Sequence, residues 1–206
     1  INFKYFFMKK KIIIFANTLW FLEKFKFGLI SYLLLKNKVQ CLYLRNGPIV
    51  DEKKINSLKN KNVEFIKVNY IFIFRKVIKN FNLSISKNEE DNLRNIIVFT
   101  IGPILLSSII FNPLLKKTII VLEGLGRVFS SRLIYYRLLK RVVQIVYKLI
   151  FSKCKYVLTL NYYDAAYLAE MNIAPISKIN TIPGTGVDTD YLKKAEENLL
   201  KSPKIY

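Results

Sequence analysis

Seven short apolar runs, rich in Ile and Val and lacking polar alternation, limit most strongly how this 206-residue chain can fold. Runs of this kind are typical of strands buried on both faces of a parallel sheet. Segments with helical apolar spacing lie between them, and strands that alternate with helices require right-handed crossovers. We therefore predict an α/β fold: a Rossmann-like parallel sheet of six or seven strands with helices on both faces. The runs lie at residues 12–15, 39–44, 63–68, 96–100, 118–122, 156–160 and 178–182, and the helical segments at 21–35, 51–60, 70–81, 103–115, 130–151 and 164–171.

The composition excludes several classes of protein. Hydrophobic residues make up 52% of the chain, which excludes disorder for most of its length. The chain contains no His, so it holds no His-based catalytic triad and no imidazole metal site of its own. Two cysteines, Cys41 and Cys154, are too few for a disulfide scaffold and favour a reducing compartment.

The charge balance is strongly basic. The chain carries 34 basic and 14 acidic residues, a formal net charge of +20. This excess indicates an anionic partner, which is a nucleic acid, a phosphate-rich substrate or an anionic membrane surface. AT-rich codons also favour Lys, so part of the excess reflects composition rather than binding.

An uncharged stretch covers residues 95–115 and is long enough to span a bilayer. Gly102-Pro103 and Asn112-Pro113 interrupt it, and such pairs are typical of turns. A strand, a turn and a short apolar helix are therefore favoured over a membrane span.

The two ends of the chain differ in character from its body. Met8 precedes three lysines and the first apolar run, so we expect it to be the natural start and residues 1–7 to be a non-native or disordered lead. A Rossmann-like domain is expected over 8–188. Residues 189–206 read as a polar helix and the start of another strand, which indicates a truncated second domain.

The loop after the fifth run is a candidate site. Glu123-Gly124-Leu125-Gly126-Arg127 directly follows a strand, and ligands bind at the carboxyl ends of parallel strands. The two glycines permit close backbone approach, and the Glu and Arg offer polar groups to a substrate. A tight turn before a helix accounts for the same residues equally well. The first loop, from Asn17, lacks the G-x-G-x-x-G dinucleotide pattern.

The helical segment at 130–151 is basic on one side. Residues 124–163 include no acid, and one arc of the helix carries Gln144 and four cations. Apolar residues such as Leu138, Val142 and Ile145 occupy the other side. Two interpretations stay open: a helix packed on the core with a solvated basic face, or a helix that contacts anionic lipid headgroups. The four cations are Arg137, Lys140, Arg141 and Lys148.

A glycine-containing turn follows the last run and ends in paired acids. Ile182-Pro183-Gly184-Thr185-Gly186-Val187-Asp188 reads as a flexible turn at a domain boundary. Asp188-Thr189-Asp190 spells a pattern that chelates divalent cations in other proteins, but capping of a helix that starts near Thr189 explains it better. We therefore expect no metal site.

Three segments together resemble a known family. The strand end at 123–129, the turn at 182–188 and the first loop and helix at 17–26 look like the N-terminal domain of family 4 glycosyltransferases, which have the GT-B fold. The most similar subgroup builds bacterial surface polysaccharide or lipid-linked glycan in the cell envelope. The resemblance covers 8–206, and Lys26 stands where the family more usually has Arg.

The resemblance implies an activity. Such an enzyme transfers a sugar from a nucleotide-diphosphate sugar to a lipid-linked or polysaccharide acceptor, with retention and with no cofactor besides the donor. Many relatives have a His in the N-terminal site, which this chain lacks. The donor would bind mainly in a C-terminal domain whose Lys and Glu pair would lie beyond Tyr206, so we expect the chain alone to be inactive.

The resemblance also implies roles for particular residues. The acceptor side of the cleft would be formed by Asn17, Lys26, Glu123, Gly124 and Arg127. The hinge that approaches the donor would contain Gly184, Gly186 and Asp188. The four cations of the 130–151 helix would face the membrane, which implies a cytoplasmic protein that is peripheral on the inner face of the plasma membrane.

A second class of function is a basic Rossmann-like module that binds nucleic acid or an anionic membrane without catalysis. Nucleic-acid binding would need exposed aromatic residues between basic ones. Most Tyr and Phe residues instead lie in apolar runs or on helix faces, so we expect no nucleic-acid partner.

Overall fold

The computed structural model describes residues 9–69, 91–126, 129 and 133–184. Its seven strands form one parallel sheet in the order β3-β2-β1-β4-β5-β6-β7. The predicted α/β, Rossmann-like fold is thereby confirmed. The strands are β1 (Lys11–Thr18), β2 (Lys38–Arg45), β3 (Glu64–Lys67), β4 (Leu93–Phe99), β5 (Thr118–Leu122), β6 (Tyr156–Thr159) and β7 (Ile179–Thr181).

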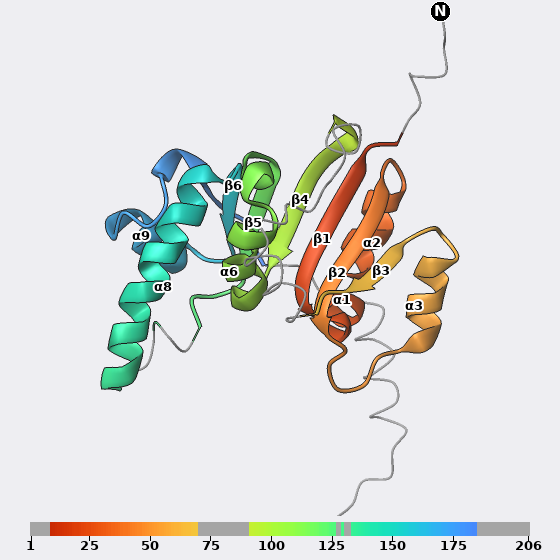
Figure 1. Cartoon of the computed structure of the whole chain (residues 1–206), viewed down its shortest axis with the longest axis horizontal. Coiled ribbons are helices and arrows are strands. Elements are labelled where there is room, and N and C mark those ends of the chain that lie inside the picture. Colours follow the sequence, from red (N-terminus) through yellow and green to blue (C-terminus); the bar gives the residue numbers. More distant parts are fainter. Residues whose placement is uncertain (1–8, 70–90, 127–128, 130–132, 185–206) are drawn as a thin grey trace, which may run out of the picture.

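Described helices occupy the crossovers β1–β2, β2–β3, β4–β5, β5–β6 and β6–β7. Figure 1 shows α1–α3 at the β1–β3 end of the sheet and α8 and α9 at the opposite end. The predicted helix at 70–81 lies outside the described residues. The helices are α1 (Leu19–Phe25), α2 (Phe27–Leu34), α3 (Glu52–Lys59), α6 (Ile101–Ile110), α8 (Ile134–Lys153) and α9 (Tyr162–Glu170), with short 3-10 helices η2 (Asn112–Lys117) and η3 (Ile176–Lys178).

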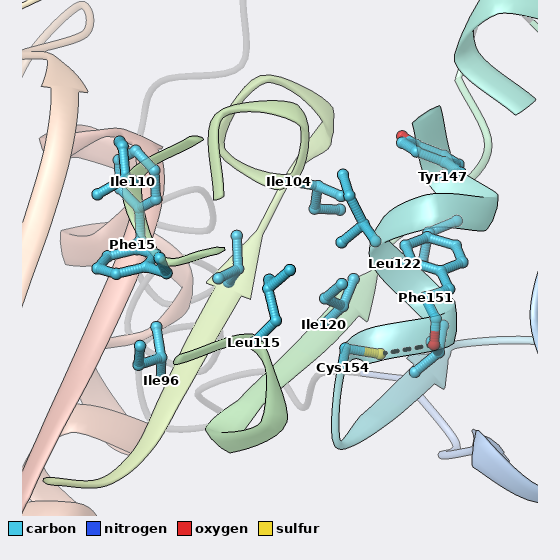
Figure 2. Packing of buried hydrophobic residues seen from close by; sticks show 14 of the residues in the cluster. Phe15, Ile96, Ile104, Ile110, Leu115, Ile120, Leu122, Tyr147, Phe151 and Cys154 are labelled. Atoms are coloured by element: carbon cyan, nitrogen blue, oxygen red, sulfur yellow. Dashed lines mark hydrogen bonds between the residues drawn. The ribbon is translucent and has the colours of Figure 1, made fainter. Parts of the chain in front are cut away.

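The alternation of side chains in the strands divides the core into two layers. In β1, Ile13 and Phe15 pack in one cluster with residues of α6 and α8, whereas Ile12 and Ile14 pack in another with residues of α1 and α2. Figure 2 shows how Phe151 and its neighbours from α8 meet residues of β5 and α6 in the first cluster. Both faces of the sheet are therefore covered, as the unalternating strand sequences require.

The uncharged stretch at 95–115 is divided, as predicted, into a strand and a short apolar helix, but Gly102-Pro103 lie in the first turn of α6 rather than in a turn before it. It contributes most of β4, then α6, then part of η2. Among the residues described, no helix combines the length and apolar character that a bilayer crossing needs.

Candidate functional site

The chain changes direction across the sheet next to β1. After β1 it builds β2 and β3 on one side, and β4 then pairs with β1 on the other side. In an open parallel sheet the crevice at such a switch point, at the carboxyl ends of the strands, is where ligands bind. The residues that follow β1, β4 and β5 at this edge are therefore candidates for a ligand-binding site.

Two predicted site residues meet at this edge. The Lys26 Nζ donates to Glu123 Oε1 at 2.6 Å, although the two residues lie 97 positions apart. The Lys26 side chain is 2% exposed, and that of Glu123 is 23% exposed. The carboxylate therefore reaches the surface while its partner is fully buried, and the pair holds the carboxylate in one orientation.

Aromatic rings enclose the buried ammonium. The Lys26 Nζ lies 4.6 Å from the ring centroid of Phe99 and 5.0 Å from that of Phe21. Phe99 ends β4 and Phe21 lies in α1, so both elements at the switch point contribute. Ring faces attract cations, and they offset part of the cost of removing the ammonium from water.

A break in the backbone accompanies this placement of Lys26. The sequence predicts one helix over 21–35, and this prediction is wrong: α1 ends and α2 begins at Lys26, whose φ and ψ are −121° and 3°. The Lys26 N–H still donates to the Leu22 carbonyl, and the Ile30 N–H donates to the Lys26 carbonyl. The hydrogen-bond pattern thus continues across a one-residue distortion that is centred on the buried ammonium.

The start of α1 is held by its cap. The Thr18 side chain accepts from the Phe21 N–H at 3.0 Å, which satisfies one of the unpaired donors of the first turn. The backbone N–H of Trp20 donates to the carbonyl of Asn46 in the loop after β2. A Cβ on Gly47 would lie 2.6 Å from that of Trp20, so this loop packs closely against the helix.

Thr100 is a further candidate for this site, and sequence reasoning missed it. It follows β4 with φ 65° and ψ 155°, a region that is costly for any residue with a Cβ. Its hydroxyl oxygen is buried and has no hydrogen-bond partner among the described residues. Strain of this kind concentrates at functional sites. The sequence places Thr100 in the run at 96–100 and Gly102-Pro103 in a turn, so the end of a strand was the available signal.

The glycine loop after β5 adopts conformations that favour glycine. Gly124 has φ +147° with open space where a Cβ would stand. Gly126 has φ +73°, and a Cβ there would lie 2.6 Å from Ile101 Cδ1 at the start of α6. The loop therefore packs against α6 beside Glu123 and leaves room at Gly124.

The other predicted site residues are not part of the Lys26–Glu123 pair. Asn17 is the second-last residue of β1, half-buried at the same edge of the sheet. Gly184 is exposed beyond β7, which is separated from β1 by β4, β5 and β6, so it does not join the Lys26–Glu123 pair. Arg127, Gly186 and Asp188, together with Asp190, lie outside the described residues.

The α8 helix packs on the core with most of its basic arc exposed, as the first of the two interpretations predicts, but only part of its predicted apolar side is buried. The buried residues are Val143, Tyr147, Ile150 and Phe151, whereas a second apolar row is exposed. That row consists of Ile134, Leu138, Val142, Ile145 and Leu149, each 57–77% exposed.

The four cations of α8 also separate into two groups. Arg137, Arg141 and Lys148 are exposed. Lys140 is half-buried, and its Nζ lies 5.1 Å from the ring centroid of Tyr167 in α9. Gln144 donates to the Tyr167 hydroxyl at 2.8 Å. One end of the predicted basic arc therefore joins α8 to α9, and the other end faces solvent.

Metal-binding groups are scarce in the part of the chain that the structure describes. It contains no cluster of three His, Cys, Asp or Glu side chains suited to a metal ion. Cys41 and Cys154 are buried free thiols, and burial raises the pKa of Cys154 to about 11. Buried protonated thiols of this kind are structural rather than reactive.

A separate hollow of about 590 Å³ lies at the opposite, amino-terminal edge of the sheet. Lys116, Lys153 and Lys178 are among its lining residues. Lys178 donates to the Ser152 and Cys154 carbonyls at the end of α8, at 2.5 and 2.8 Å. This lysine caps a helix C-terminus, which explains it without a ligand.

Solved structures with the same fold include two from Rickettsia. A glycosyltransferase from Rickettsia africae superposes with a TM-score of 0.51 at 14% identity, over 96% of this chain and 52% of its own. A UDP-N-acetylglucosamine 2-epimerase from Rickettsia bellii superposes with a TM-score of 0.55 at 14% identity, over 95% of this chain and 50% of its own. This chain thus spans about half the length of each. No protein-family model matches the sequence, and no match is found among curated proteins.

Proposed function

We propose that this chain forms the acceptor-binding half of a sugar-transferring enzyme, with its site at the carboxyl ends of β1, β4 and β5. The observation that carries the proposal is the Lys26–Glu123 pair. It joins two distant segments that resemble the family 4 glycosyltransferases, and it lies at the switch point of the sheet. The superposition on a glycosyltransferase supports the proposal at the level of the fold.

Glu123 is the group that would contact the acceptor. One carboxylate oxygen accepts from Lys26, and the partly exposed carboxylate keeps further lone pairs for a sugar hydroxyl. Because Lys26, whose ammonium is enclosed by the rings of Phe21 and Phe99, holds the carboxylate, little entropy is lost when the hydroxyl binds. Asn17 and Gly124 would complete this side of the cleft, as would Arg127.

The donor would be a nucleotide-diphosphate sugar. In this proposal it binds mainly to a second domain, and the sugar is transferred with retention and without a metal or another cofactor. Residues 8–188 would form the acceptor domain, residues 189–206 would lead to the second domain, and Gly184, Gly186 and Asp188 would form the crossing. The 206-residue chain alone would then transfer no sugar.

The acceptor would be a polysaccharide or a lipid-linked glycan of the cell envelope. A lipid-diphosphate acceptor is anionic, which suits a chain with a formal net charge of +20. The protein would then be peripheral on the inner face of the plasma membrane, and no nucleic acid would be needed as a partner.

A second candidate is a sugar-nucleotide epimerase, which the superposition on the UDP-N-acetylglucosamine 2-epimerase favours. The two activities differ in their need for an acceptor. Epimerisation converts a nucleotide sugar by itself, whereas transfer releases a nucleoside diphosphate and requires an acceptor. Incubation with nucleotide sugars, with and without a lipid-linked acceptor, separates them.

The decisive variant is Glu123→Gln in the chain joined to its donor-binding domain. Loss of one charged hydrogen bond to the acceptor should lower kcat/KM by about 10–100-fold. The matched control is Glu170→Gln, the same change at an exposed residue that ends α9. Unchanged turnover in Glu123→Gln would remove Glu123 from the site. If the parent protein formed no product from any nucleotide sugar, a binding module without catalysis would be favoured.

A further inference from the structure

The exposed apolar row of α8 forms a continuous stripe. Ile134, Leu138, Val142, Ile145 and Leu149 follow one another at intervals of four, four, three and four residues, which places them on one side of the helix. The stripe extends about 22 Å along the helix axis at 1.5 Å per residue. Val143, Tyr147 and Ile150 anchor the opposite side in the core, so the stripe faces outward.

A basic row borders this stripe. Arg137, Arg141 and Lys148 are exposed and lie between the stripe and the side of α8 that contacts α9. The sequence of α8 includes no acid. In the neighbouring helix α9, the last residue, Glu170, is an exposed acid. An apolar stripe beside a one-sign charged row is the pattern of a helix that lies in a membrane interface.

A groove adjoins the basic row. It has a volume of about 330 Å³ and is lined by Arg141, Gln144, Ile145, Lys148, Met171 and Ile173. Ile145 and Met171, on its two sides, are 63% and 53% exposed. The groove thus places two cations between apolar shoulders, which suits the phosphate of a lipid headgroup with acyl chains on either side.

We propose that α8 and the adjoining groove bind an anionic lipid bilayer, with the stripe inserted at the acyl boundary and headgroup phosphates held by Arg141 and Lys148. The proposal deepens the proposed function, because it names the surface by which a membrane-bound acceptor would be approached. A second copy of the chain fits less well, since α8 contains no acid that could neutralise the basic row of the other copy. Figure 1 shows that α8 lies at the end of the sheet away from α1, so this surface is distinct from the Lys26–Glu123 site.

The test is co-sedimentation of the 206-residue chain with vesicles at low salt. Phosphatidylcholine vesicles are compared with vesicles in which a quarter of the lipid is phosphatidylglycerol. We expect at least tenfold tighter binding to the anionic vesicles. Leu138→Ser with Ile145→Ser, and separately Arg141→Gln with Lys148→Gln, should each weaken that binding at least tenfold.

Matched control variants distinguish vesicle binding by this surface from attraction due to the overall charge of the chain. Lys53→Gln with Lys59→Gln removes the same charge from exposed positions of α3, and Ile49→Ser removes an apolar side chain that is 82% exposed in another loop. Each should change vesicle binding less than twofold. All changes are at exposed positions, and circular dichroism verifies that each variant is folded.

Several outcomes would overturn the proposal. Equal binding to both vesicle types excludes the anionic headgroup, and equal loss in the α3 and α8 charge variants leaves only diffuse attraction. Full binding by the double serine variant excludes insertion of the stripe, and an acidic protein partner would then be the better occupant. The assay needs no sugar, so these outcomes leave the Glu123 test unaffected, and Glu123→Gln should bind vesicles as the parent chain does.

Discussion

Lys26 shows how one residue joins local and long-range structure. It interrupts a helix, and its ammonium is buried between two aromatic rings and the Glu123 carboxylate. A buried ion pair contributes little net stability, but removing one partner leaves the other without compensation. The pair therefore orients Glu123 more than it stabilises the fold.

A double-mutant cycle tests this reading of the pair. Lys26→Met keeps the packing of the side chain but removes its charge, and it should lower the free energy of unfolding by about 1–3 kcal/mol, since Glu123 reaches solvent. With Glu123→Gln also present, the second change should cost less, with a coupling of about 1–2 kcal/mol. Urea unfolding measures all four proteins. Strict additivity would show that the two groups do not interact in solution.

The buried thiols predict how stability depends on pH. Burial raises the pKa of Cys154 to about 11 and that of Cys41 further above its usual range, and Lys178 lowers the former in part. In the unfolded chain both thiols have the ordinary pKa of 9.0. Their contribution is therefore present below that pH and is lost as the pH rises toward the folded pKa, by about 0.8 kcal/mol per thiol at pH 9.5. Urea unfolding at pH 7.5 and 9.5 measures the loss, which should be smaller in Cys154→Ala; equal stability at both values would contradict it.

At the scale of elements, changing either of two glycines to alanine should have opposite effects on stability. Gly28 lies in α2, where a Cβ would meet nothing within 4 Å, and Gly47 lies in a loop at φ +89° against Trp20. Gly28→Ala should raise the free energy of unfolding by about 0.5–1 kcal/mol because it improves helix propensity. Gly47→Ala should lower it by about 1–3 kcal/mol because of the backbone conformation and the contact. Thermal unfolding compares the two directly, and the same sign for both would refute the argument.

Most elements could be predicted because their signals are local. The run at 118–122 matches β5 at both ends, and the stretch at 95–115 forms a strand followed by a short apolar helix, as predicted. The break at Lys26 could not be found in this way, since two of the three groups around its ammonium, Phe99 and Glu123, come from β4 and the loop after β5. The orientation of α8 was also undetermined, because its sequence has two apolar rows and only packing selects which one is buried.

At the scale of the whole molecule, charge repulsion should limit stability. With 34 basic and 14 acidic residues, most cations have no acid to pair with. Salt screens repulsion between exposed charges, so raising NaCl from 20 to 200 mM should raise the thermal midpoint. A variant with Lys53, Lys59 and Lys61 changed to Gln should show a smaller rise. A midpoint that falls with added salt would mean that attractive pairs dominate instead.

The sequence by itself determined the fold class, the strand positions and the basic character of this protein. These depend on composition and periodicity, which act over a few neighbouring residues. The family resemblance also placed Lys26 and Glu123 on the acceptor side of one cleft. Only the tertiary structure decided that the two form an ion pair around a buried ammonium, that Thr100 is strained after β4 and that an apolar row of α8 is left exposed. Each of these depends on which segments become neighbours when the strands pair, and no local pattern carries that information.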